Sequence, residues 1–116
     1  MPGELDNETW IIERGGAVIE RQVSDGVASL KPLDKLVYCL WVADYSMRNA
    51  GDLQTASDLY RPFQDEATRL SEELCLHVTR AAFSLRRSDL EKQYFHLFDH
   101  VCNEIRAAEK REFPSR

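Results

Sequence analysis

Residues 32–49, PLDKLVYCLWVADYSMRN, contain the longest apolar run of the chain and decide the predicted fold. Pro32 suits the first position of a helix, where its missing N–H costs nothing. Asn49-Ala50-Gly51 can end the helix at the other side, because Gly51 readily adopts the left-handed conformation of a helix carboxyl-terminal cap. The apolar residues between these ends wrap well beyond one stripe, as expected of a helix that others surround. They are Leu33, Leu36, Val37, Leu40, Trp41, Val42 and Met47. We therefore expect a central helix over residues 32–49.

The carboxyl-terminal half is predicted to add three more helices. A short helix is expected over residues 52–60. Arg61-Pro62 then interrupts the helical pattern, so that a new helix can begin after it. Residues 63–85 repeat apolar groups in steps of three or four, which predicts one long helix. The last helix is predicted to begin at Ser88, where Ser88 and Glu91 form a capping box. Its buried stripe consists of Leu90, Tyr94, Leu97, Phe98, Val101, Ile105 and Ala108.

Residues 9–22 can be interpreted in two ways. Gly15-Gly16 between two β-branched runs is a signal for a two-residue hairpin. However, neither run alternates cleanly, and an isolated hairpin beside helices has no sheet to join. We favour a helix here, with small residues at a helix crossing, followed by a loop over residues 24–31.

Length and composition agree with one soluble helical domain. The chain has 116 residues, of which 43% are hydrophobic and 30% charged. We expect an all-α fold, a single compact helical domain of four to five helices over residues 1–116, with Trp41 and Phe98 largely buried. The longest apolar run has eight residues, whereas a membrane span needs about 20. The acidic start lacks the features of a secretory signal, so we expect a cytoplasmic protein with no membrane partner.

The three cysteines give no sign of a disulfide framework or a zinc site. They are an odd number, are widely spaced and form no C-x-x-C pair. Cys39 lies in the apolar run and Cys102 on the apolar face of the last helix, where cysteine behaves as a small hydrophobe. We expect reduced thiols that pack in the core.

Negative charge is concentrated at the amino-terminal end. The net charge is −5, and residues 1–30 contribute −4 of it, with six acids against Arg14 and Arg21. The candidate acidic surface consists of Glu4, Asp6, Glu8, Glu13, Glu20 and Asp25. Direct binding of nucleic acid needs a basic stripe that displaces counterions from phosphates, so this charge argues against it.

A polar cluster follows the greasy part of the predicted central helix. Its candidate recognition residues are Asp44, Tyr45, Arg48, Asn49, Asp52 and Gln54. Asp44 and Arg48 are one turn apart and can pair, while Asn49 can cap open carbonyls. We expect this recognition corner to be a structural helix stop. The alternative is a recognition point, because polar groups in an apolar element must be paired by something.

The residues offer little for catalysis. His96 and His100 are spaced i, i+4 with Glu104 one turn further, a geometry that can hold a divalent metal. We expect a solvated histidine face instead, and a hydrogen-bonded packing role for His77. No nucleophile elbow and no glycine-rich phosphate loop occurs in the sequence. We therefore expect no enzymatic activity and no cofactor.

Around the recognition corner, the chain resembles the small bacterial helical proteins related to DNA mimic protein 19. The resemblance covers about residues 30–85. It rests on Leu33-Asp34-Lys35-Leu36-Val37-Tyr38 with Leu40-Trp41, on Asp44-Tyr45, and on Asn49-Ala50-Gly51-Asp52 with Gln54. Ala50 stands where the family has a glycine, and Asp52 where an aromatic or aliphatic residue is usual. The resemblance implies an all-helical fold and, for the founding member of the family, an acidic surface that imitates duplex phosphate and occupies a DNA-binding protein.

The sequence thus predicts a non-enzymatic domain that acts by binding a protein partner. One alternative is an acidic DNA mimic, in which the amino-terminal carboxylates present phosphate-like charge to a DNA-binding protein. The other alternative is a metal-dependent hydrolase that uses His96, His100 and Glu104.

Overall fold

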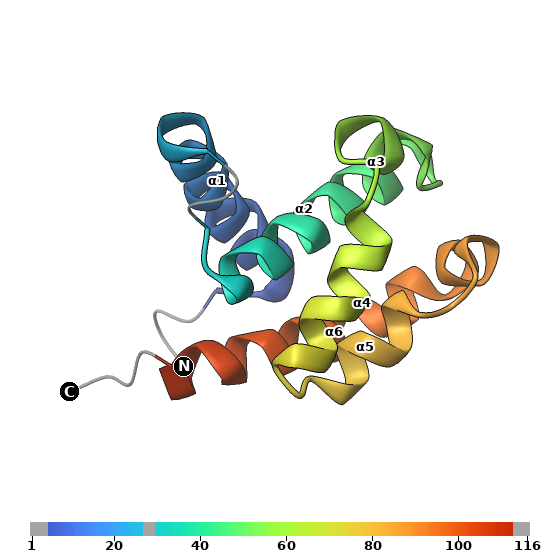
Figure 1. The fold of residues 1–116 in the computed structure, drawn as a ribbon. Coiled ribbons are helices and arrows are strands. Elements are labelled where there is room, and N and C mark those ends of the chain that lie inside the picture. Colours follow the sequence, from blue (N-terminus) through green and yellow to red (C-terminus); the bar gives the residue numbers. More distant parts are fainter. Residues whose placement is uncertain (1–4, 27–29, 113–116) are drawn as a thin grey trace.

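The computed structural model describes residues 5–26 and 30–112, in which helices are the regular elements and no strand occurs. The all-α prediction is confirmed, although these residues form six helices instead of four to five (Figure 1). The helices are α1 (Asn7–Asp25), α2 (Pro32–Ala50), α3 (Gln54–Leu59), α4 (Phe63–Glu73), α5 (His77–Phe83) and α6 (Arg87–Glu112). Residues 27–29 of the predicted loop lie outside the described residues.

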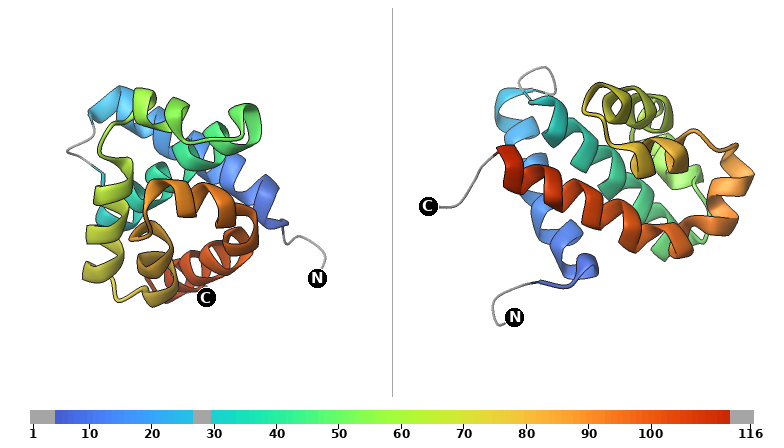
Figure 2. Two further views of the ribbon diagram at one scale, coloured as in Figure 1. Left: turned by 90° about the vertical axis from the view of Figure 1, so that its right-hand side faces the viewer. Right: turned by 90° about the horizontal axis from the view of Figure 1, so that it is seen from below.

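The predicted central helix is found as α2. It begins at Pro32 and ends at Gly51, whose φ of 77° is left-handed and whose N–H donates to the carbonyl of Met47. Twelve of its 19 residues are buried, because α1, α3, α4 and α6 all contact it. Figure 2 shows α6 lying alongside α2, with its carboxyl end close to α1. The beginning of α2 and the end of α6 therefore lie beside α1 on one side of the molecule.

Residues 9–22 belong to α1, so the helix prediction is confirmed and the hairpin alternative is wrong. Asp6 caps the helix by accepting a hydrogen bond from the N–H of Thr9 at 2.7 Å. Gly15 is buried where α1 crosses α2, and a Cβ atom there would overlap the Cβ, Cγ and Cδ1 atoms of Trp41. The glycine thus permits a close helix crossing. Trp41, predicted to be largely buried, is partly buried against the core, and its ring stacks on the exposed Tyr45.

The predicted long helix over residues 63–85 is wrong, because the chain breaks it at Cys75. Cys75 has a φ of 61°, and its N–H donates to the carbonyl of Glu72 at 3.1 Å. The N–H of Leu76 donates to the carbonyl of Ser71 at 2.8 Å, which completes a Schellman motif. Apolar residues continue in helical steps across the break, so periodicity alone cannot reveal it. Val78, on the predicted stripe, is 41% exposed.

The predicted capping box at Ser88 is also wrong. Helix α6 begins one residue earlier, at Arg87, and Ser88 lies inside it. The Glu91 carboxylate accepts a hydrogen bond from the backbone N–H of Leu53 at 2.8 Å. Leu53 directly precedes α3, which was predicted over residues 52–60 and is found over 54–59. A tertiary contact with the start of α3 therefore takes the place of the local cap.

One continuous core joins all six helices. Phe98 is buried as predicted, and so are Cys39 and Cys102, whereas Cys75 is exposed. Burial raises the pKa of the Cys39 and Cys102 thiols far above the usual value. Among the helices in the described part of the chain, none combines the length and apolar character that crossing a bilayer requires.

Candidate functional site

The recognition corner is centred on a buried carboxylate. Asp44 is 3% exposed, and both of its oxygens accept hydrogen bonds from Arg48 Nε, at 3.0 and 2.9 Å. The Tyr94 hydroxyl on α6 donates to Asp44 Oδ1 at 2.7 Å. Burial raises the pKa of Tyr94, and the Asp44 charge raises it further. The Asp44 carboxylate in the apolar helix α2 thus has hydrogen-bond partners on its own helix and on α6.

The remaining polar residues of the corner make local bonds that end α2 and begin α3. Asn49 Nδ2 donates to the carbonyl of Tyr45 at 2.7 Å. Asp52 Oδ1 accepts from the Gln54 N–H, and the Gln54 side chain donates to Asp58, both at 3.0 Å. These bonds give the exposed Asn49, Asp52 and Gln54 a role in the turn, whereas the side chains of Tyr45 and Arg48 make no bond within the turn.

Tyr45 and Arg48, together with Phe95 on α6, form what we call the Tyr45–Arg48–Phe95 surface. Tyr45 is 45% exposed and Phe95 is 52% exposed. The Arg48 guanidinium lies 5.2 Å from the centre of the Phe95 ring, and its Nη1 donates to Glu8 at 3.0 Å. Burial acts to lower the pKa of Arg48, but the hydrogen bond to Asp44 together with the negative charges of Asp44 and Glu8 outweighs it, and the pKa is raised. Arg48 is therefore a fixed cation between α1, α2 and α6.

Sequence reasoning missed Phe95 because it is remote along the chain from the corner. The available signal was its position on the last helix, where it falls outside the stripe of buried apolar residues. An aromatic residue off that stripe must face solvent or a partner.

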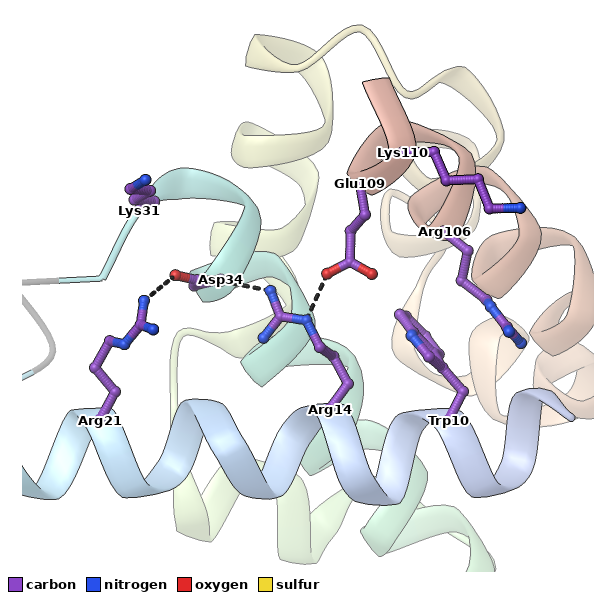
Figure 3. Close-up of a pocket in the computed structure, with 8 residues that line it drawn as sticks. All are labelled: Trp10, Arg14, Arg21, Lys31, Asp34, Arg106, Glu109 and Lys110. Atoms are coloured by element: carbon purple, nitrogen blue, oxygen red, sulfur yellow. Dashed lines mark hydrogen bonds and ion pairs between the residues drawn. The ribbon is translucent and has the colours of Figure 1, made fainter. Parts of the chain in front are cut away.

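A second feature is the hollow between α1, the beginning of α2 and the end of α6, which we call the α1–α6 hollow. Its volume is about 560 Å³. Its walls carry five basic side chains, two acidic ones and one indole (Figure 3). These are Arg14, Arg21, Lys31, Arg106, Lys110, Asp34, Glu109 and Trp10. Sequence reasoning missed the set because three separate segments supply it. The helical spacing of Arg14 with Arg21, and of Arg106 with Lys110, was the available signal.

Ion pairs cross the α1–α6 hollow. Arg14 donates from Nε to Glu109 and from Nη2 to Asp34 Oδ1, the second at 2.6 Å. Arg21 donates to the other oxygen of Asp34 at 3.1 Å, so the buried Asp34 carboxylate is shared by two guanidinium groups. Burial acts to lower the pKa of Arg14, but these carboxylates outweigh it and the pKa is raised. The pairs bind α1 to α2 and α6.

The described residues of the predicted acidic surface, Asp6, Glu8, Glu13, Glu20 and Asp25, are all exposed, and two of them also make contacts within the chain. Glu4 lies outside the described residues. Asp6 caps α1, and the backbone hydrogen bond from Thr9 lowers its pKa, while Glu8 pairs with Arg48. Glu13, Glu20 and Asp25 are exposed along α1.

The predicted metal-ligand candidates are not brought together. Glu104 accepts hydrogen bonds from the N–H of Val78 at 3.0 Å and from the N–H and hydroxyl of Thr79 at 2.7 Å, which caps α5. His96 and His100 are exposed on α6. Across the residues described, no group of three or more His, Cys, Asp or Glu side chains has a metal-binding arrangement. The packing role predicted for His77 is wrong, because the break at Cys75 makes this exposed residue the first of α5.

Comparison with family models, curated proteins and solved structures finds no match for this chain. The relation to the DNA mimic family therefore stays a prediction from the residues quoted above.

Proposed function

We propose that this protein is a non-enzymatic domain that binds another protein through the Tyr45–Arg48–Phe95 surface. The observation that carries this proposal is an arginine that three helices hold in place, with the half-exposed Phe95 ring against it and the half-exposed Tyr45 ring three residues before it on α2.

The composition of this surface supports a protein partner. Tyrosine and arginine are enriched among the residues that dominate binding energy at protein interfaces, and aromatic residues are enriched in interface cores. Arg48 is held by Asp44 and Glu8 before any partner arrives. Fixing a side chain in advance lowers the entropy lost on binding. Tyr45 is likewise held in place by its stack on Trp41, with ring centres 5.4 Å apart.

The test is affinity capture from an extract of the cells that make the protein, followed by identification of the retained proteins. The bait is immobilised as the unaltered chain, as Tyr45→Ala or as Phe95→Ala. Leu59→Ala is the matched control, because Leu59 is an apolar residue of similar exposure, 49%, on α3. We expect the unaltered chain and the control to retain the same protein, and both surface variants to lose it.

Two further outcomes distinguish the competing functions. Retention of the partner by both surface variants, with loss on Glu13→Gln or Glu20→Gln and at high salt, favours the DNA mimic, since exposed charges are screened by salt. Lack of any protein retained specifically by the unaltered chain contradicts the proposal.

A further inference from the structure

The outer face of α1 carries an apolar stripe, which we call the α1 stripe. Its members follow one another in steps of four, three and four residues, which places them on one side of the helix. They are Ile12, Gly16, Ile19 and Val23. Ile12 is 58% exposed and Val23 is 81% exposed, although both side chains are apolar. The buried residues Ile11, Gly15 and Val18 lie on another side, where α1 packs against α2 and α6, and Figure 1 shows α1 at the edge of the molecule.

The spacing and shape of the α1 stripe suit a second helix. Steps of four, three and four are the apolar spacing by which one helix packs along another. The stripe extends over about three turns, or about 16 Å of helix. Gly16 leaves its middle open, because a Cβ atom there meets nothing within 4 Å, and Ile19 already packs against the core. A side chain of a docked helix can therefore enter between Ile12 and Val23.

Two acidic residues follow one edge of the α1 stripe. Glu13 and Glu20 each come directly after an isoleucine of the stripe, and they are seven residues apart, so both lie on the same edge. Both are exposed. Within the described residues, the ion pairs of α1 involve Glu8, Arg14 and Arg21 instead. The edge therefore keeps its negative charge, which is complementary to lysine or arginine residues.

The other charges of α1 do not cancel this edge. The two arginines of α1 both donate to Asp34, on the side of the helix that faces α2. Two copies of α1 packed along the stripe would bring Glu13 toward Glu20 in an antiparallel pair and toward Glu8 in a parallel pair. Because like charges that face each other are unfavourable, a second copy of this chain is a poor occupant.

A partner helix with the opposite charge pattern removes this repulsion. We propose that the α1 stripe docks an amphipathic helix of another protein, which covers Ile12 and Val23 with apolar side chains. Lysine or arginine residues of that helix pair with Glu13 and Glu20. The α1 stripe shares no residue with the surface assigned to the proposed function, so this proposal does not rest on that function.

The test uses two synthetic peptides of about three heptads, with leucine at the a and d positions. They differ only at the e and g positions, which are lysine in one peptide and glutamate in the other. Fluorescence anisotropy of a trace of labelled peptide, titrated with the full chain at about 50 mM salt, measures the Kd. We expect a Kd of about 100 μM or tighter for the lysine peptide, and binding at least about tenfold weaker for the glutamate peptide.

Variants with matched controls locate the site of peptide binding. Ile12→Gln and Val23→Gln change exposed residues and keep a good helix former, and each should weaken binding of the lysine peptide by about fivefold or more. Leu59→Gln, at a residue 49% exposed on α3, should leave the Kd within about twofold. Glu20→Gln should weaken binding by about threefold. Glu72→Gln makes the same change of charge at an exposed residue of α4 and should leave the Kd unchanged.

Four results would overturn the proposal. The first is absence of saturable binding of the lysine peptide, or equal binding of both peptides. The second is weakening by Glu20→Gln without weakening by Ile12→Gln or Val23→Gln, because the carboxylates alone then suffice, as in a DNA mimic. The third is a dimer of the unaltered chain in sedimentation that Ile12→Gln dissociates. The fourth is binding to phosphatidylcholine vesicles that Val23→Gln abolishes, since the stripe then contacts a lipid surface.

Discussion

Asp44 shows how one buried carboxylate can be both tolerated and useful in the central helix. It accepts hydrogen bonds from Arg48 on its own helix and from Tyr94 on α6. Replacing it with alanine leaves the buried Tyr94 hydroxyl without its acceptor and releases Arg48. We expect Asp44→Ala to reduce the free energy of unfolding by about 1–3 kcal/mol, measured by urea denaturation.

Tyr94→Phe is the matched variant for this carboxylate, because it removes the hydroxyl and keeps the ring. It should cost about 0.5–1.5 kcal/mol, less than Asp44→Ala, since Arg48 still pairs with the charge. An unchanged midpoint for Asp44→Ala would contradict a structural role for the corner.

Cys75 offers a simple gain in stability. Its φ of 61° is a conformation that costs a side-chain-bearing residue about 1–2 kcal/mol, and glycine is the usual residue at this position of a Schellman motif. The thiol is exposed, so little packing is lost. We expect Cys75→Gly to raise the free energy of unfolding by about 0.5–1 kcal/mol after the extra chain entropy of glycine is counted. A lower melting temperature for Cys75→Gly would contradict the helix break at this residue.

At the scale of helices, Gly15 and Gly16 are adjacent but have opposite environments. A Cβ atom on Gly15 would overlap Trp41, whereas one on Gly16 meets nothing within 4 Å. We expect Gly15→Ala to destabilise the protein by about 1–3 kcal/mol, because α1 and α2 must move apart. Gly16→Ala should instead stabilise it by about 0.5–1 kcal/mol through helix propensity. Thermal unfolding of both variants tests the close crossing of α1 and α2 at Gly15. Equal changes in melting temperature for the two variants would contradict it.

The sequence was informative at both ends of α2 and at its i, i+4 ion pair. Pro32 and Gly51 mark the ends of α2, and the i, i+4 spacing of Asp44 and Arg48 predicts their ion pair. The helix break at Cys75 was not predicted, because a cysteine occupies a position where glycine is the expected signal. The hydrogen bond of Glu91 was not predicted, because its partner, the N–H of Leu53, comes from a distant segment.

The candidate sites also differ in whether their contacts join residues close in sequence or residues from distant segments. The turn formed by Asn49, Asp52 and Gln54 consists of bonds over short sequence distances, and it was found from the sequence. Phe95 and the α1–α6 hollow depend on how α6 lies against α1 and α2, and neither spacing nor composition encodes that placement directly.

At the scale of the whole molecule, the buried thiols are expected to lower the free energy of unfolding as the pH becomes alkaline. The pKa values of Cys39 and Cys102 are raised in the folded state, whereas an unfolded thiol titrates near about 8.5. Their contribution is complete below that pH and is lost as the pH rises toward the folded pKa. Each thiol should lower the free energy of unfolding by about 1.4 kcal/mol per pH unit above about pH 9.

Urea unfolding at pH 7.5, 9 and 10 under reducing conditions measures this slope. Cys102→Ala should reduce it by about half between the two higher values, since one of the two thiols is removed. A free energy of unfolding that stays constant over this range would show that the thiols are not buried.

The most direct test of the central claim is the affinity of Phe95→Ala for the partner that the unaltered chain captures, measured by calorimetry with the purified partner. Phe95 is half exposed, so its truncation should leave the melting temperature close to that of the unaltered chain. We expect the Kd to rise by about tenfold or more, the size of effect that a residue central to an interface produces. Leu59→Ala should stay within about twofold of the unaltered chain. Equal Kd values for Phe95→Ala, Leu59→Ala and the unaltered chain would contradict binding through the Tyr45–Arg48–Phe95 surface.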